Sequence, residues 1–470
     1  MDQVVLISTY ELGRQPFGLA SPAAWLKDAG ADVVLQDLAV DDFDDGPIRG
    51  ALLVGVYVPM HTATRMAEPL LGRIRELNPL GHVVVYGLYA TMNADHLRGV
   101  GADTIIGGEF EEPLVALYRE LLEARASSTP PPIDRTVLSL GRQQFRVPDR
   151  AGLPALNRYA ALELSPSKIR TVGYTEASRG CKHLCRHCPI VPVYGGRFRV
   201  VQVAAVLADI RQQVMAGAEH ITFGDPDFLN APAHTMRIVA ALHKEFPDLT
   251  YDATIKVEHL VRHADLVREL KRTGCVLVTS AVESFEDDDL KRLDKRHTMA
   301  DFEGALELLR DIGLALNPTF VAFTPWTTAE GYLDFLDTIR RLPLVDEVSP
   351  VQYSIRLLIP SGSRLLEIEE VAALVDTFDA TALAYPWSNP DPRLDQLHRD
   401  VVRIVQADAS ASRSRRETFT AVCRAASNLL GPGAGADPDL SALHDVTTIP
   451  HLTEPWYCCA EPTDNQLLRL

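Results

Sequence analysis

Two runs of alternating strands and helices constrain the fold of this chain more than any other sequence feature. Near the N-terminus, short β-branched runs such as Val4–Ile7, Ala51–Val54 and Val83–Tyr86 alternate with helical stretches such as Met66–Leu77. A second alternation has expected strands at residues 169–176, 220–224, 250–256, 276–283, 314–323 and 347–358. Alternation at this spacing indicates parallel sheets covered by helices. We therefore predict an α/β fold whose second part is a partial (β/α)6 barrel.

Breaks in the pattern divide the chain into segments. The run ARASSTPPP at residues 124–132 excludes helix and favours an extended backbone, and the glycine-rich GPGAGADP from Gly431 predicts a flexible hinge. Between residue 364 and this hinge the pattern becomes helical. We expect a parallel-sheet domain at 1–123, a linker at 124–157, the barrel at 158–363, a helical domain at 364–430, and a flexible linker with a tail at 431–470.

Charge and hydropathy exclude several classes of partner. The 46 basic and 63 acidic residues give a net charge of −17, which argues against binding to nucleic acid phosphates. No apolar run reaches the roughly 18–20 residues of a membrane span. The first residues lack the basic start and small-residue cleavage site of a secretory signal. We expect a cytoplasmic protein with a small-molecule substrate and neither a membrane nor a nucleic acid partner.

Three of the seven cysteines lie in one loop after a predicted strand. Cys181, Cys185 and Cys188 present soft thiolate ligands at short spacing, which suits an iron–sulfur cluster. Three ligands on a cubane leave one iron open to an amine and a carboxylate of a small molecule. The alternatives are a structural zinc ion or unligated thiols. A zinc site needs a fourth ligand, and His183 and His187 would crowd it because they lie in the same loop.

The cysteine spacing resembles the motif of the radical SAM superfamily. That motif is C-x3-C-x-aromatic-C after the first barrel strand, and here His187 stands in the aromatic position. The resemblance implies a [4Fe-4S] cluster that reductively cleaves S-adenosylmethionine. It also implies an external electron donor such as flavodoxin or ferredoxin.

Polar residues at the ends of the later strands extend the resemblance. The candidate cofactor-binding residues are Asp225, Asp227, Lys256, Glu283, Ser284 and Arg356. The first two lie in Gly224–Phe228, which resembles the acidic turn that receives the methionine amino group. The Glu-Ser pair resembles one that reaches the cofactor ribose or methionyl group. Charges like these are usually solvated, and for Lys256 and Arg356 that reading stays open. Lys256 would otherwise face the barrel mouth, and Arg356 would pair with a carboxylate through two hydrogen bonds.

Residues 3–123 resemble the cobalamin-binding Rossmann-type domain that precedes many radical SAM barrels. The stretch Tyr10–Ala20 resembles the loop after the first strand of that group. The histidine-bearing D-x-H-x-x-G signature is absent, so the sequence offers no lower-face ligand for cobalt. Cobalamin binding and a structural or substrate-gating role both remain open.

The C-terminal segment WYCCAEP at residues 456–462 matches the CUAEP/CCAEP-tail radical SAM group, whose relatives can carry selenocysteine at the first cysteine position. Adjacent thiols suit a thiophilic atom such as trivalent arsenic, or redox chemistry. We expect Cys458 and Cys459 to be catalytic, against the alternative of incidental thiols in a disordered tail. A flexible coil of the length of segment 431–455 spans roughly 25–30 Å, enough to reach the barrel mouth. Cys275 and Cys423 are expected in the core.

These features predict a radical SAM enzyme that uses a carbon radical on a small molecule, with the tail thiols binding the substrate or acting in redox. One concrete form is carbon–arsenic or carbon–sulfur/selenium bond formation. A cobalamin-dependent radical SAM methyltransferase is the first alternative. The second is a non-catalytic sensor that binds a metalloid or metal at the tail.

Overall fold

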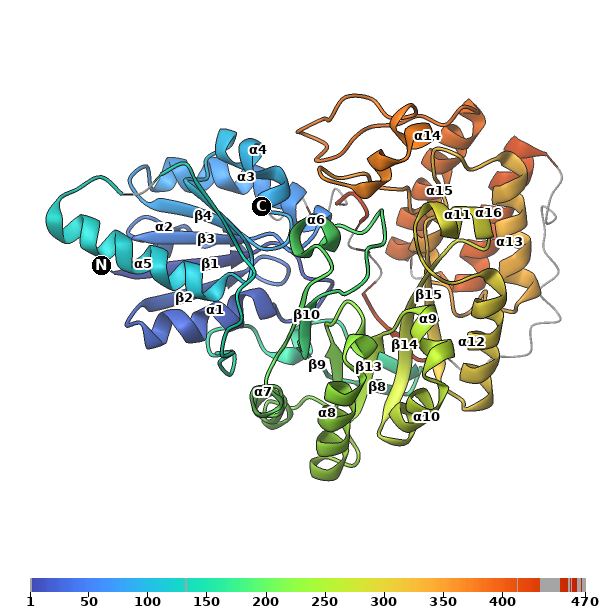
Figure 1. The fold of residues 1–470 in the computed structure, drawn as a ribbon, viewed down its shortest axis with the longest axis horizontal. Helices are drawn as coiled ribbons and strands as arrows, with labels where there is room; N and C mark the ends of the chain where they lie inside the picture. The colour runs from blue at the N-terminus through green and yellow to red at the C-terminus, as the bar shows by residue number, and fades with distance from the viewer. Residues whose placement is uncertain are drawn as a thin grey trace.

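The computed structural model describes residues 2–131, 133–411, 413–431, 449–454, 457, 459–462 and 466. The predicted hinge beyond Gly431, together with Trp456 and Cys458, lies outside the described residues. Two parallel sheets dominate the molecule, and helices pack around both (Figure 1). The α/β fold predicted from the sequence is confirmed.

The first sheet has the strand order β2-β1-β3-β4-β5-β6, and all its strands are parallel. The strands are β1 (Gln3–Ser8), β2 (Asp32–Asp37), β3 (Leu53–Tyr57), β4 (His82–Tyr86), β5 (Thr104–Gly108) and β6 (Arg135–Ser139). The helices are α1 (Phe17–Asp28), α2 (Asp45–Ile48), α3 (His61–Leu77), α4 (Ala94–Gly99) and α5 (Glu111–Ser127). Alternate strand residues enter two separate cores, one under α3 and one under α1 and α5, because side chains of a strand point to opposite faces.

Strand β6 lies inside the segment that the sequence predicts as a linker. Its residues pair in parallel with β5 and complete the first sheet. Strand β6 is an edge strand whose side chains are exposed or half-buried, so it lacks the apolar pattern of a buried strand. Residues 140–161, which contain no strand, follow β6 and lead toward the second sheet.

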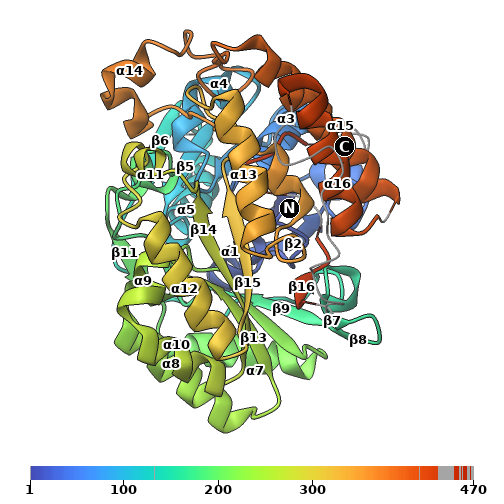
Figure 2. The same cartoon turned by 90° about the vertical axis from the view of Figure 1, so that its right-hand side faces the viewer.

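The second sheet has the order β15-β14-β13-β12-β9. Its strands are β9 (Val172–Thr175), β12 (His220–Phe223), β13 (Thr250–Thr254), β14 (Cys275–Glu283) and β15 (Ala315–Phe320). The covering helices are α7 (Val203–Met215), α8 (Pro232–Glu245), α9 (Val257–Arg262), α10 (Ala264–Arg272), α11 (Asp287–Arg292), α12 (Met299–Asp311) and α13 (Ala329–Arg341). In Figure 2, α12 and α13 lie over the outer face of β14 and β15.

The expected sixth strand at 347–358 is largely replaced by a 3₁₀ turn, Pro350–Ser354. One parallel bridge between Phe323 and Arg356 marks the sixth position of the barrel. Pro350 begins the turn, and proline has no N–H to donate to a ladder. Two backbone hydrogen bonds, from Phe323 to Ile355 and from Leu357 to Phe323, therefore join only the end of this segment to the barrel.

The C-terminal region contains α14 (Glu369–Ala372), α15 (Pro392–Ala411) and α16 (Arg415–Leu430). The helical pattern expected between residue 364 and the hinge is interrupted, because α14 ends at Ala372 and α15 begins only at Pro392. The segment between these two helices forms a loop in which the Asp379 carboxylate accepts hydrogen bonds from two backbone amides. Aspartate competes with helix in this way.

Beyond the hinge, β16 (His451–Leu452) pairs antiparallel with β7 (Leu162–Ser165), which pairs with β8 (Lys168–Arg170). The C-terminal segment is thereby attached beside the second sheet. In the described part of the chain, no helix combines the length and apolar character needed to cross a membrane.

Candidate active site

The three-cysteine loop begins at a sharp turn after β10 (Ser178–Gly180) and ends at α6 (Ile190–Tyr194). Gly180 has a φ of +72°, and a Cβ there would lie 2.5 Å from a backbone oxygen, so only glycine fits. Cys181 and Cys185 are buried. Burial raises the pKa of Cys181, and it raises that of Cys188 to about 12.

Two lysines provide positive charge beside these thiols. The Lys256 Nζ atom lies 3.7 Å from Cys185 Sγ. Burial opposes the charge of Lys295, but the carboxylate of Glu283 and the nearby thiols keep its pKa above the usual value. Buried soft donors with adjacent cations suit an anionic iron–sulfur cluster. The donor set therefore fits a [4Fe-4S] cluster.

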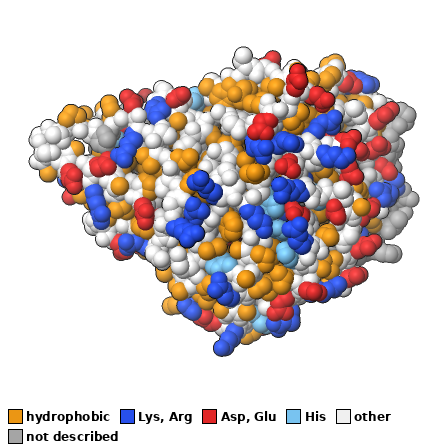
Figure 3. All heavy atoms as spheres, viewed as in Figure 1, with side chains coloured by type: hydrophobic (Ala, Val, Ile, Leu, Met, Phe, Trp, Pro, Cys, Tyr) orange, Lys and Arg blue, Asp and Glu red, His pale blue; other side chains and the backbone are white. Residues whose placement is uncertain are grey.

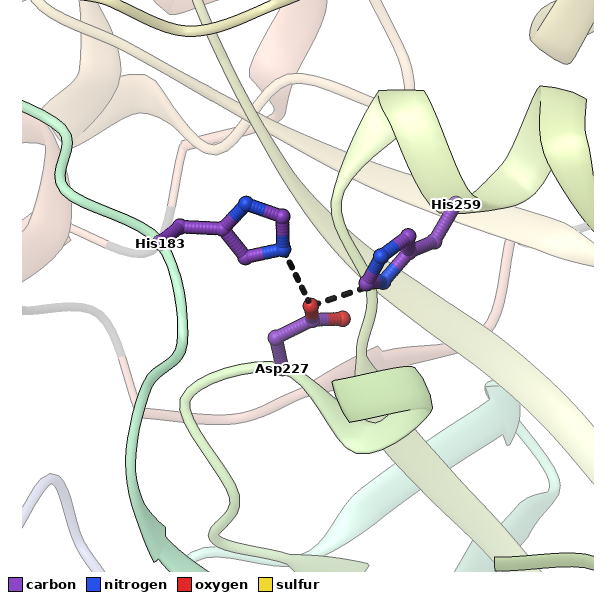
Figure 4. A group of neighbouring side chains, drawn as sticks. All are labelled: His183, Asp227 and His259. Carbon is purple, nitrogen blue, oxygen red and sulfur yellow. Dashed lines mark ion pairs between the residues drawn. The ribbon is translucent and has the colours of Figure 1, made fainter. Parts of the chain in front are cut away.

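Asp227, at the end of β12, meets two histidines (Figure 4). Its Oδ2 atom lies 2.8 Å from His259 Nδ1 and 3.5 Å from His183 Nε2. Its Oδ1 accepts a 3.4 Å hydrogen bond from the Lys256 backbone amide. Burial alone would raise the pKa of Asp227, but the two imidazoles beside its Oδ2 atom hold the pKa below its usual range. Asp227 is therefore a buried carboxylate with an imidazole nitrogen of each histidine facing the same oxygen.

His259 is the residue of this group that sequence reasoning missed. It is fully buried on α9, and within the described residues neither ring nitrogen makes a well-directed hydrogen bond. An unsatisfied buried polar group calls for a ligand or water. The ligand atoms of His183, Asp227 and His259 lie within 4.8 Å of one another, which also suits a divalent metal ion. The sequence feature that could have identified His259 is its position three residues after Lys256, which was itself a candidate site residue.

Asp225 forms hydrogen bonds with the turn that precedes the cysteine loop. Its Oδ2 atom accepts a hydrogen bond from the Ala177 amide at 2.9 Å, and its Oδ1 accepts one from Ser178 Oγ at 2.5 Å. Burial raises its pKa to about 7. With both oxygens occupied, Asp225 positions the loop that carries Cys181.

Glu283 ends β14 in the left-handed region, with φ at +72°. Its Oε1 lies 3.1 Å from both His187 Nε2 and Lys295 Nζ. Burial alone would raise its pKa, but Lys295 and the His187 imidazole hold the pKa below the usual range. Strained backbone of this kind concentrates at functional sites. The histidine in the family's aromatic position is thus bound to a buried carboxylate.

Ser284 and Arg356 have other partners. Ser284 Oγ donates to Asp289 at 3.2 Å and accepts from the Glu286 amide at 3.0 Å, which secures the start of α11. Arg356 donates to Asp395 at 2.8 Å, and its guanidinium lies 3.5 Å from the centre of the Trp387 ring. These contacts join the sixth barrel position to the C-terminal region. They do not bring Arg356 to the cysteine loop.

Much of the carboxyl edge of the first sheet is covered by the protein itself. Residues at the ends of its strands are at most 9% exposed, namely Thr9, Tyr10, Glu11, Tyr57, Met60, His61 and Tyr89. His61 contacts Glu461 of the C-terminal segment. These described side chains are covered by neighbouring parts of the chain, whereas Leu12, Arg14 and Leu88 at the same edge are half-buried.

A model of the radical SAM superfamily matches residues 175–339. The hopanoid C-3 methylase of Methylococcus capsulatus is 26% identical over 335 residues, which cover 67% of this chain and 62% of that protein. The threonylcarbamoyladenosine tRNA methylthiotransferase MtaB of Thermotoga maritima is 22% identical over 291 residues, 60% of each protein. The chain thus spans about three fifths of the length of these curated relatives.

Two solved structures share the fold across most of the chain. The cobalamin-dependent S-adenosylmethionine radical enzyme OxsB, with aqua-cobalamin and S-adenosylmethionine bound, matches with a TM-score of 0.68 at 15% identity, covering 99% of this chain and 78% of its own. The radical methyltransferase TsrM from Kitasatospora setae, with tryptophan and a SAM analogue bound, matches with a TM-score of 0.64 at 18% identity, covering 87% and 90%. Residues 175–339, with the cysteine loop at their start, thus match the radical SAM superfamily, and the chain as a whole shares the fold of these two structures.

Proposed function

We propose that this chain is a transferase that uses S-adenosylmethionine at a [4Fe-4S] cluster to modify a small molecule. The observation that carries the proposal is the set of three thiols, Cys181, Cys185 and Cys188, which share one loop with cations at the strand ends. When bound, the cluster supplies the electron that cleaves S-adenosylmethionine. The likeness to a methylase and a methyltransferase supports the transferase class.

The residues around the loop have distinct roles in this proposal. Asp227 stays ionised and accepts hydrogen bonds from the amino group of S-adenosylmethionine. His183 and His259 orient its carboxylate. Lys256 and Lys295 offset the negative charge of the thiolates. Because these groups are buried, their charges act in a low dielectric and interact strongly.

An external one-electron donor of the flavodoxin or ferredoxin class would serve this site. Figure 3 shows Lys and Arg side chains, with histidines among them, gathered in the middle of one face. Lys182 of the cysteine loop and Arg262 of α9 are exposed, and both act electrostatically on His263. Positive charge beside the loop favours an acidic donor, although the whole chain is negative.

Anaerobic reconstitution with iron and sulfide tests this function. We expect iron–sulfur absorbance and, with a reductant, conversion of S-adenosylmethionine to an adenosyl product. 5′-Deoxyadenosine would indicate adenosyl radical chemistry, and methylthioadenosine would indicate an aminocarboxypropyl radical. A reconstituted protein that holds a full cluster and gives no cleavage product would refute the proposal.

Cobalamin-dependent methyl transfer is the second candidate. It is supported by likeness over most of the chain to OxsB and TsrM, both solved with cobalamin. The buried side chains at the edge of the first sheet oppose it. If this candidate is right, the protein should form S-adenosylhomocysteine and a methylated product only when cobalamin is added.

The tail thiols give the proposal its substrate class. Cys459 lies beside Ala460, whose amide donates a 3.2 Å hydrogen bond to the Tyr457 carbonyl, so the segment turns sharply. We assign Cys458 and Cys459 to a thiophilic substrate atom, such as trivalent arsenic, or to redox chemistry. Replacing both by alanine should remove product formation and leave cleavage of S-adenosylmethionine intact.

A further inference from the structure

The seam between the two sheets contains an arrangement that the proposed function does not use. The C-terminal segment leaves β16 beside the second sheet and reaches the carboxyl edge of the first sheet. We define Tyr457, Cys459, Ala460 and Glu461 as the tail turn.

The tail turn is held by the first turn of α3. Thr62 Oγ1 donates hydrogen bonds to the carbonyls of Ala460 at 2.6 Å and Tyr457 at 3.2 Å. Thr62 is fully buried, so its hydroxyl would cost free energy without these acceptors. The contact is therefore specific to a turn that offers two carbonyls at this spacing.

The Glu461 side chain makes a second contact with the same helix. Its Oε1 lies 2.7 Å from Nε2 of the fully buried His61, and its Oε2 accepts a 3.2 Å hydrogen bond from Arg65 Nε. Burial opposes the charge of this carboxylate, but His61 and Arg65 lower its pKa. The start of a helix also favours a negative charge. Three side chains near the start of α3, those of His61, Thr62 and Arg65, thus hold one carboxylate and one turn.

An upstream contact brings the segment to the neighbouring strand. Tyr10, which follows β1, donates a 3.0 Å hydrogen bond from its hydroxyl to Glu454. His61 and Thr62 follow β3, and β1 and β3 are neighbours in the order β2-β1-β3-β4-β5-β6. In this order the connections diverge between β1 and β3, and sheets of this kind bind ligands at that point.

We propose that the ligand edge of the first sheet is a binding site for the chain's own tail turn, occupied in place of a corrin. His61, Thr62 and Arg65 are the positioning residues, and they hold the turn that contains Cys459 between the two domains. Tyr457 and Ala460 also pack against a core that includes both α3 and barrel residues. Only the chemical use of the thiol rests on the proposed function.

Hydrogen exchange of the full-length apo chain, read by mass spectrometry on the C-terminal peptide, tests the docking without any need for activity. Thr62→Val removes the hydroxyl and keeps the shape. Loss of about 1 kcal/mol shifts the docked equilibrium about fivefold, so we expect exchange about fivefold faster. Thr64→Val is the matched control, because the Thr64 hydroxyl donates to Met60 in its own helix, and it should leave the tail unchanged.

Two results would overturn the proposal. One is a tail peptide that exchanges in the native chain at the rate of an unfolded peptide, or equally in both threonine variants. The other is one equivalent of hydroxocobalamin retained by the native chain through gel filtration. Protection lost in Thr62→Val together with no retained corrin supports it. Failure to cleave S-adenosylmethionine would count against the proposed function and leave this test unaffected.

Discussion

Replacement of Arg179 by methionine should destabilise the protein more than any other substitution of an arginine in the seam. Its guanidinium lies 3.3 Å from Glu109, 2.7 Å from Glu111 and 2.6 Å from Glu176. It also lies over the Phe110 ring, 4.8 Å from its centre. The arginine side chain is 7% exposed, and it joins the first sheet to the turn that precedes the cysteines.

The magnitude follows from what methionine would leave behind. Removal of one partner from a buried ion pair costs about 3–5 kcal/mol, because the remaining charge is uncompensated. Arg179 holds the pKa of Glu111 below its usual value, while burial raises that of Glu109 to about 7. Without the arginine, the folded-state pKa values of these carboxyls rise. A carboxyl group whose pKa is raised in the folded state lowers the stability of the protein as pH increases. The variant should therefore lose more stability relative to the native chain at pH 8 than at pH 5.

Thermal unfolding of the apo chain at both pH values measures this effect. For a domain of about 200 residues, 1 kcal/mol shifts Tm by about 2–4 °C, so Arg179→Met should lower the first transition by roughly 6–20 °C at pH 8. Arg135→Met is the control, because the Arg135–Glu120 pair is about 40% exposed and worth about 0–1 kcal/mol. Equal shifts in the two variants, or a larger loss at pH 5, would refute the reasoning.

Three further predictions concern other parts of the molecule. Cys185→Ala should abolish the absorbance of the reconstituted cluster and the cleavage of S-adenosylmethionine, whereas retention of both would remove this residue from the ligand set. Gly224→Ala would place a Cβ 1.9 Å from the Tyr174 hydroxyl oxygen, so urea unfolding should show a loss of about 1–3 kcal/mol. Burial raises the pKa of Asp37 to about 6, so the Asp37 carboxylate costs stability as pH rises from 4 to 6. Asp37→Asn removes that cost, and its stability relative to the native chain should increase by about 1–3 kcal/mol over this range; a pH-independent difference would contradict it.

Local patterns were enough to predict the two sheets and the position of the cysteine loop. Buried strands such as β1 and β4 have continuous apolar runs. The short length of each run and the absence of a helical period identify it as a strand. Strand β6 escaped prediction because an exposed edge strand needs no such run. The interrupted helix after Ala372 escaped because Asp379 bonds to the backbone of its own loop.

The sequence by itself determined the order of the parallel elements and the spacing of Cys181, Cys185 and Cys188, because both depend on residues close together in the chain. Only the tertiary structure decided which charges meet. It brought His259 to Asp227 and paired Arg356 with the C-terminal region. It also joined His61 to Glu461 across 400 residues. Contacts of this kind depend on how separately folded layers dock, and no local periodicity encodes that docking.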